Sequence, residues 1–265
     1  MSDLNGKSIV VTGATSGIGR AAAVKLATLG ARLTLVGRNQ ERGSRIEREV
    51  RSLGAEARLE LVELTQASAM QNIIARTVAE YGRIDAAVLA AAEMPDAQAM
   101  VPLARVDDAS IERGLLSEVR STVHALRALL RQLLTREDGD RSIVLVSSVN
   151  GLGAAPNAAL YSASKAACIS LAKAAALDYA RSGIRVNALV LGAFETPMLA
   201  TAFERQSPDG NTEPIRRIYE SHIAMGRIGR PEEAADTIAW LCSGSSSYLT
   251  GSSVILDGGL TSLAR

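Results

Sequence analysis

Residues 12–20 read TGATSGIGR, directly after a short apolar run and at the start of a segment of helical period that extends to residue 29. Three glycines fall in the turn between the predicted strand and the predicted helix: Gly13, Gly17 and Gly19. Glycines there let the backbone approach a pyrophosphate closely, and the N-terminus of the helix stabilises its negative charge. Glycine turns also occur for steric reasons alone, but this position between strand and helix favours a dinucleotide site.

Short, nearly continuous apolar runs recur along the chain and suit strands that are buried on both faces. They lie at 8–11, 33–36, 59–64, 86–90, 142–147, 186–191 and 253–256. Segments of helical period alternate with them, at about 17–29, 39–53, 66–81, 107–135, 157–181 and 231–243. This alternation predicts an α/β fold, a doubly wound Rossmann sheet of about seven parallel strands with helices on both faces. We expect a single domain over 1–265.

The charge of the chain is almost balanced, with 29 basic and 28 acidic residues. Such a balance gives no electrostatic footprint for nucleic acid or for an anionic membrane surface. The start of the chain lacks the basic and apolar regions of a secretion signal, and no run of about 18 apolar residues occurs, so we expect a cytoplasmic protein. Cys168 and Cys242 have no metal-ligand spacing, so we expect buried thiols and no metal site.

The segment 193–226 departs from the regular alternation. It follows a predicted strand, contains three prolines and is far longer than a usual strand–helix loop. Ligands of open α/β sheets lie beyond the carboxyl ends of the strands. We therefore expect a substrate lid at about 193–226; a surface excursion without function is the alternative.

The end of the second predicted strand carries Gly37 and Arg38. An acidic residue in place of Gly37 would accept hydrogen bonds from the ribose hydroxyls of NAD(H). The guanidinium of Arg38 suits a 2′-phosphate, which it can bind through charge-assisted hydrogen bonds. The pattern favours NADP(H); an arginine that is merely solvated, with NAD(H) as cofactor, remains the alternative.

Taken together, the motifs resemble those of the short-chain dehydrogenase/reductase family, and the resemblance covers nearly all of the chain. The glycine turn matches the family's TGxxxGxG, and Tyr161 and Lys165 form its YxxxK. Ser148 lies thirteen residues before Tyr161, Glu63 stands where the family usually has an aspartate near the adenine, and Thr196 matches a threonine that contacts the cofactor.

The resemblance implies a role for each of these residues. Tyr161 exchanges a proton with the substrate, Ser148 (or, as the weaker alternative, Ser147) hydrogen-bonds the substrate oxygen, and Lys165 holds the nicotinamide ribose. An ammonium about 4 Å from a phenolate stabilises it by roughly 4 kcal/mol at an effective dielectric of about 20. The expected cofactor-binding residues are Gly13, Thr15, Ser16, Gly17, Ile18, Gly19, Arg38, Glu63, Leu64, Ala90, Tyr161, Lys165, Gly192, Phe194 and Thr196.

Two positions depart from the family pattern. The NNAG that usually follows the fourth strand is Leu89-Ala90-Ala91-Ala92 here, so the side-chain amides that brace the sheet are missing. The asparagine of the family's proton relay falls on Glu118 by ungapped counting. Glu118 is therefore a candidate catalytic residue that could hold the relay water through its backbone, perturb the site or point to solvent.

The sequence predicts an NADP(H)-dependent oxidoreductase that interconverts a ketone and a secondary alcohol, acting as a ketoreductase on a small molecule. The alternatives are an NAD(H)-dependent alcohol or sugar dehydrogenase and a dinucleotide sensor that has lost turnover. Apolar residues predict the roof of the substrate pocket: Met94, Met100, Phe194, Met198, Leu199 and Phe203. The alanine-rich segment 157–181 and the family resemblance predict a homo-oligomer, a dimer or tetramer.

Overall fold

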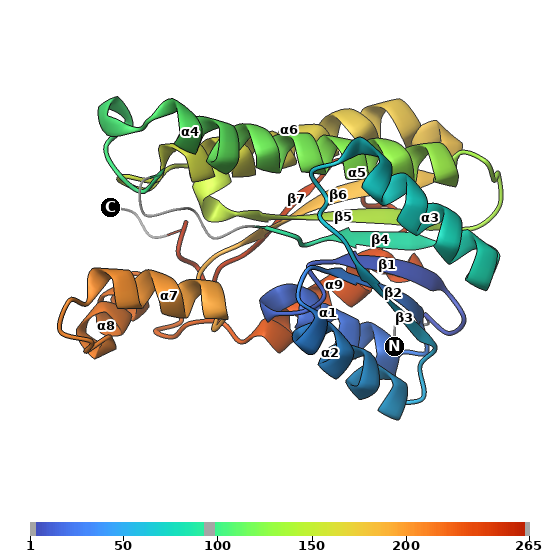
Figure 1. The fold of residues 1–265 in the computed structure, drawn as a ribbon, viewed down its shortest axis with the longest axis horizontal. Coiled ribbons are helices and arrows are strands. Elements are labelled where there is room, and N and C mark those ends of the chain that lie inside the picture. Colours follow the sequence, from blue (N-terminus) through green and yellow to red (C-terminus); the bar gives the residue numbers. More distant parts are fainter. Residues whose placement is uncertain (1–3, 93–98, 263–265) are drawn as a thin grey trace.

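The computed structural model describes residues 4–92 and 99–262, so Met94 lies outside the described residues. The fold is a seven-stranded parallel sheet with the order β3-β2-β1-β4-β5-β6-β7 (Figure 1). The strands are β1 (Ser8–Thr12), β2 (Arg32–Gly37), β3 (Ala57–Leu61), β4 (Ala86–Leu89), β5 (Arg141–Ser148), β6 (Ile184–Leu191) and β7 (Ser253–Leu256). The order reverses between β1 and β4, which is the point where ligands bind in doubly wound sheets.

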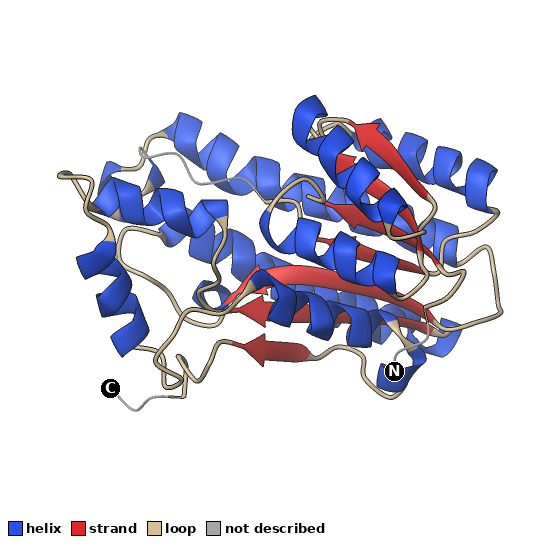
Figure 2. Cartoon of the chain, turned by 90° about the horizontal axis from the view of Figure 1, so that it is seen from below, coloured by secondary structure: helices blue, strands red, loops and turns tan. Residues whose placement is uncertain are grey.

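Helices cover both faces of the sheet, as Figures 1 and 2 show. One face is covered by α1 (Gly17–Thr28), α2 (Gln40–Ser52) and α9 (Pro231–Cys242), and the other by α3 (Ala67–Tyr81), α5 (Ser117–Leu133) and α6 (Ala159–Tyr179). Consecutive strand residues supply the two cores: Ile9 and Val11 pack with the first set of helices, and Val10 packs with the second. This is why the central strands read as nearly continuous apolar runs.

The predicted architecture is confirmed, with two local differences. The third strand ends at Leu61, paired with Gly37 at the end of β2, so Glu63 lies beyond the strand and does not end it. The predicted helix 107–135 contains α4 (Asp108–Ile111) and then a π-helical turn, η3 (Glu112–Leu116), directly before α5. Hydrophobic periodicity does not reveal such a turn, which inserts one residue into the helix.

The segment 193–226 carries two helices, α7 (Pro197–Gln206) and α8 (Glu213–Ser221), which project from the sheet in Figure 1. Its base is closed by main-chain pairing, because Glu195 N donates to Gly229 O and Gly229 N donates to Ala193 O. A small apolar cluster of its own holds the helices together, formed around Phe203, Ile223 and Ile228. The segment is thus a folded unit above the carboxyl ends of the last strands.

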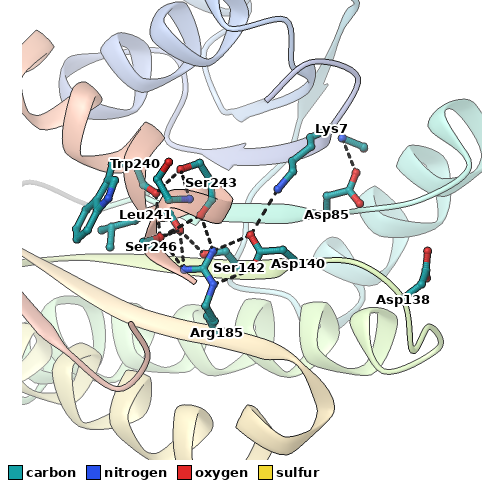
Figure 3. Close-up of polar contacts among 12 residues, drawn as sticks. Lys7, Asp85, Asp138, Asp140, Ser142, Arg185, Trp240, Leu241, Ser243 and Ser246 are labelled. Atoms are coloured by element: carbon teal, nitrogen blue, oxygen red, sulfur yellow. Dashed lines mark hydrogen bonds and ion pairs between the residues drawn. The ribbon is translucent and has the colours of Figure 1, made fainter. Parts of the chain in front are cut away.

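Arg185, near the start of β6, forms a hydrogen-bond network at the amino ends of the strands (Figure 3). Its guanidinium donates to both carboxylate oxygens of Asp140, at 2.8 and 3.0 Å, and to the carbonyls of Leu241 and Ser243. The side chain is 7% exposed. Burial raises the pKa of Asp140, but hydrogen bonding and charge from Arg185 and the charge of Lys7 outweigh this and lower it. The network ties β6 to the end of α9, away from the predicted site.

Within the parts of the chain described, the helices are too short or too polar to cross a bilayer.

Candidate active site

The glycine turn after β1 has the geometry of a cradle for an anion. Gly13 and Gly17 adopt positive φ values of 68° and 50°, and a Cβ on Gly13 would lie 2.7 Å from Ala90 O. A Cβ on Gly19 would lie 2.3 Å from Gly13 O. Helix α1 begins at Gly17 without a side-chain cap on its first N–H groups. Those groups and the small turn suit a pyrophosphate, which the helix dipole attracts.

The second strand ends beside this turn, with little space at Gly37. A Cβ on Gly37 would lie 2.2 Å from Thr15 Cγ2, so any other residue there requires Thr15 to move. Arg38 Nη1 lies 3.2 Å from Glu63 Oε2, and both side chains are about half exposed, at 55% and 49%. The structure therefore brings together Thr15, Arg38 and Glu63, three residues that the sequence analysis assigned to the cofactor.

Thr12 is a site residue that the sequence analysis passed over. Its hydroxyl accepts hydrogen bonds from Ala90 N at 3.1 Å and Ala91 N at 3.2 Å, and it donates to Val88 O. It thereby braces β1 against the end of β4, where the family's side-chain amides are absent. The only signal in the sequence was its place as the threonine of TGxxxGxG.

The segments that follow the later strands also approach one another closely. A Cβ on Gly192 would lie 2.8 Å from Asp257 Cα, and a Cβ on Gly17 would lie 3.4 Å from Thr196 Cγ2. Thr196 thus lies beside the glycine turn, and its hydroxyl caps α7 by accepting from Leu199 N. Phe194 differs from expectation, because its side chain is buried against Gly229 and leaves only its backbone for a ligand.

The contacts of the remaining expected cofactor residues say less about a cofactor site. Ser16 is exposed as the residue before α1, while Ile18 and Leu64 pack partly against the two cores. Cys168 and Cys242 are buried free thiols. In the described ranges, no three His, Cys, Asp or Glu side chains gather in a way that could hold a metal ion.

Two adjacent serines at the end of β5 have different orientations. Ser147 is buried and its hydroxyl donates to Lys165 O at 2.8 Å, which ties the strand to α6. Ser148 is half-buried, and its hydroxyl accepts from Asn150 N in the 3₁₀ turn η4 (Val149–Gly151). Of the two, Ser148 has the more accessible hydroxyl, while Ser147 has a structural partner.

Tyr161 and Lys165 lie on α6, one turn apart. Lys165 Nζ lies 5.4 Å from the centroid of the Tyr161 ring. The lysine side chain is 5% exposed, whereas Tyr161 is half-buried. Burial lowers the pKa of Lys165, but the negative charge of Glu118 and the hydrogen bond to it outweigh this and hold that pKa above its ordinary value. The ammonium therefore stays charged beside the phenol.

Glu118 on α5 is the partner of this lysine. Its Oε1 lies 2.5 Å from Lys165 Nζ, and its side chain is 10% exposed. The sequence left open whether the Glu118 carboxylate points to solvent, and this possibility is wrong because the side chain is buried. The ion pair joins α5 to α6 directly below Tyr161.

Comparison with known proteins agrees with this geometry. The family model described as enoyl-(acyl carrier protein) reductase matches residues 13–261. The 2,5-dichloro-2,5-cyclohexadiene-1,4-diol dehydrogenase of Sphingobium indicum is 36% identical, over 99% of this chain and 100% of that protein. The crystal structure of levodione reductase superposes with a TM-score of 0.93 at 26% identity, over 98% of this chain and 100% of that one. NAD⁺-bound xylitol dehydrogenase gives 0.90 at 31% identity, over 97% and 99%.

The close contact of η4 with α6 provides a test of how the site is held. A Cβ on Gly151 would lie 2.7 Å from the carbonyl carbon of Lys165, so Gly151→Ala should separate η4 from α6 and cost about 1–3 kcal/mol of stability. Gly153→Ala is the matched control, because nothing lies within 4 Å of its Cβ. Denaturant unfolding of both variants measures the difference; equal stabilities would contradict the packing described.

Proposed function

Because this chain belongs to the short-chain dehydrogenase/reductase family, whose members are oxidoreductases acting on alcohols and ketones, we propose that it is an NADP(H)-dependent ketoreductase. The observation that carries the proposal is the set Ser148, Tyr161 and Lys165 at the carboxyl edge of the sheet, beside the glycine cradle. The reacting carbonyl would lie between the hydroxyls of Ser148 and Tyr161.

Each of these side chains has a chemical task in ketone reduction. Residues around the glycine turn would hold the dihydronicotinamide cofactor, which would supply the hydride for the carbonyl carbon. Tyr161 donates its phenolic proton to the carbonyl oxygen, which completes the alcohol. Ser148 donates a hydrogen bond to that oxygen while negative charge develops on it. Lys165, charged and buried, stabilises the phenolate that is left.

NADP(H) is proposed over NAD(H) on the contacts of β2. An acidic residue that would hold the ribose hydroxyls of NAD(H) has no room at Gly37 while Thr15 keeps its position. Arg38 beside it offers a guanidinium at the sheet edge, where a 2′-phosphate would accept charge-assisted hydrogen bonds. Glu63, its partner, would then share the guanidinium with the phosphate.

A second candidate is an NAD(H)-dependent dehydrogenase of a cyclic diol or a sugar alcohol. It is favoured by the name of the Sphingobium relative and by the NAD⁺-bound xylitol dehydrogenase structure. The catalytic residues would be the same, with Tyr161 acting as the base. Coenzyme selectivity separates this candidate from the first.

We also propose that the segment 193–226 is the substrate lid. It follows β6 and contains Thr196, which lies beside the glycine turn. Its helix α7 carries Met198 and Leu199, both half-buried, and Leu199 packs in the apolar cluster around Phe203. Arg216 on α8 pairs with Glu195 at 3.1 Å, so the helices are fastened to the base of the segment. An apolar lid of this kind would exclude water from the hydride transfer.

We further propose that the chain forms a homo-oligomer through the face of α5 and α6. Large apolar side chains are exposed along this face, including Val123 at 37%, Leu134 at 42% and Leu177 at 85%. A second copy that packs its own α5 and α6 there would bury them.

Tyr161→Phe tests the catalytic role of the phenol. The variant should lose about 10²–10⁴-fold in turnover, since the proton donor is gone. A panel of cyclic and linear ketones with NADPH measures turnover, and Tyr179→Phe on the same helix is the control. Turnover that survives Tyr161→Phe would refute the proposed mechanism.

Arg38→Ala tests the coenzyme assignment. Loss of a hydrogen bond to a charged phosphate should weaken NADPH binding by about 10–100-fold while NADH binding stays unchanged. Fluorescence titration with both coenzymes measures this. Arg45→Ala is the control, because Arg45 pairs with Glu41 on α2. If NADH binds more tightly than NADPH to the wild type, the NAD(H) candidate replaces the first.

Leu177→Glu tests the oligomer. A carboxylate without a partner in a buried interface costs about 2 kcal/mol or more, so sedimentation should detect a smaller species. Leu53→Glu is the control, since Leu53 is 45% exposed at the end of α2, on the other face of the sheet. An unchanged sedimentation coefficient for Leu177→Glu would remove this face as the interface.

A further inference from the structure

The ion pair of Glu118 and Lys165 is a departure from the proton relay that the family resemblance implies. The two residues lie 47 positions apart in sequence, on α5 and α6, and their charged atoms are 2.5 Å apart. Both side chains are almost fully buried, at 10% and 5% exposed. A carboxylate therefore contacts directly the ammonium that is expected to act on Tyr161.

The helix that carries Glu118 is shaped around this contact. The π-helical turn Glu112–Leu116 ends two residues before Glu118 and packs against α6. Such turns change the direction in which the following side chains point, and they recur at functional sites. On the other side, Ser147 and Gly151 hold the backbone of Lys165 through the hydrogen bond and the close packing described above. Lys165 is thus fixed from three elements.

Tyr161 is consequently influenced by both charges of the Glu118–Lys165 ion pair, and not by an ammonium alone. The ionisable and charged groups around Lys165 are Tyr161 and Cys168 on α6 and Glu118 on α5, while Ser147 and Ser148 on β5 are neutral. The ammonium favours the phenolate form of Tyr161, and the carboxylate beside it opposes that form. Cys168 is a buried thiol whose own burial raises its pKa, so it adds no charge at neutral pH.

We propose that Glu118 is a positioning residue that holds Lys165 Nζ in place and offsets its charge, which weakens the stabilisation that this ammonium gives to the phenolate form of Tyr161. This proposal rests on the proposed function of Tyr161 and adds a control of its ionisation. A protonated phenol is the form that donates to a carbonyl oxygen, whereas alcohol oxidation needs the phenolate. At a given pH an enzyme changes the rates of both directions together, so the pair sets the pH dependence of the reaction and not its direction.

Glu118→Gln is the decisive variant, because it keeps the shape and a hydrogen-bond acceptor but removes the charge. The phenol of Tyr161 should then lose its proton at a lower pH than in the wild type, because the ammonium is no longer offset. Tyrosinate absorbance measured against pH, with the spectrum of Tyr161→Phe subtracted, reads this directly and requires no substrate. Tyr81 does not interfere, because burial raises its pKa to about 12.

The pH profile of kcat/KM for reduction of 1,4-cyclohexanedione by NADPH should show the same displacement, with activity falling at a lower pH than in the wild type. Glu118→Asp, which retains the charge, should restore both the titration and the profile. A titration of Glu118→Gln that coincides with the wild type would overturn the proposal, and so would equal behaviour of the Gln and Asp variants.

Failure of the proposed function gives a different result from failure of the proposal about Glu118. If Tyr161→Phe retained turnover, the catalytic role of the phenol would be lost, yet the absorbance titration would still report whether Glu118 controls its ionisation. If Glu118→Gln does not fold, Glu118→Asn supplies the same test with the residue that the family has at this place. A purely structural ion pair would lower the stability of these variants and leave the titration unmoved.

Discussion

A buried ammonium, that of Lys165, is the constraint on which the arrangement of the site depends. A charge that is 5% exposed is tolerated only with a partner of opposite charge and good geometry, which Glu118 provides. The backbone of the same residue accepts the hydroxyl of Ser147 from β5 and lies against Gly151 in η4. Strand β5 and helices α5 and α6 must therefore meet at one residue, and Tyr161 and Ser148 are positioned as a consequence.

Close approach of backbone segments is the second constraint, and it acts at the cofactor side of the cleft. Gly13 lies against the end of β4, Gly19 lies against Gly13, and Gly192 lies against Asp257, each at a distance that excludes a Cβ. The small residues that follow β4 suit this crowding. With no side-chain amide available there, the hydroxyl of Thr12 accepts the two main-chain N–H groups, since groups left unpaired in a buried position are costly.

The sequence was sufficient for the fold because its signals were local and repeated. Apolar runs predicted all seven strands, and the segments of helical period between them predicted the helices that cover the sheet. The spacing of Tyr161 and Lys165 predicted their common face on α6. The orientation of Glu118 could not be predicted, because it depends on a π-helical turn and on a partner 47 residues away. The brace made by Thr12 and the burial of Phe194 likewise depend on how distant strands pack.

Two cations assigned to the cofactor are each held by a carboxylate, but the two pairs differ in the cost of separation. Arg38 and Glu63 are about half exposed, and an ion pair of that kind contributes about 0–1 kcal/mol. A phosphate can therefore engage Arg38 at little cost. Lys165 and Glu118 are almost fully buried, and removing one partner of such a pair costs about 3–5 kcal/mol. The first pair can adapt to a ligand, whereas separation of the second is costly. Mutation at the end of β2 should accordingly change coenzyme selectivity readily. The charges around Tyr161, in contrast, depend on the packing of α5 against α6.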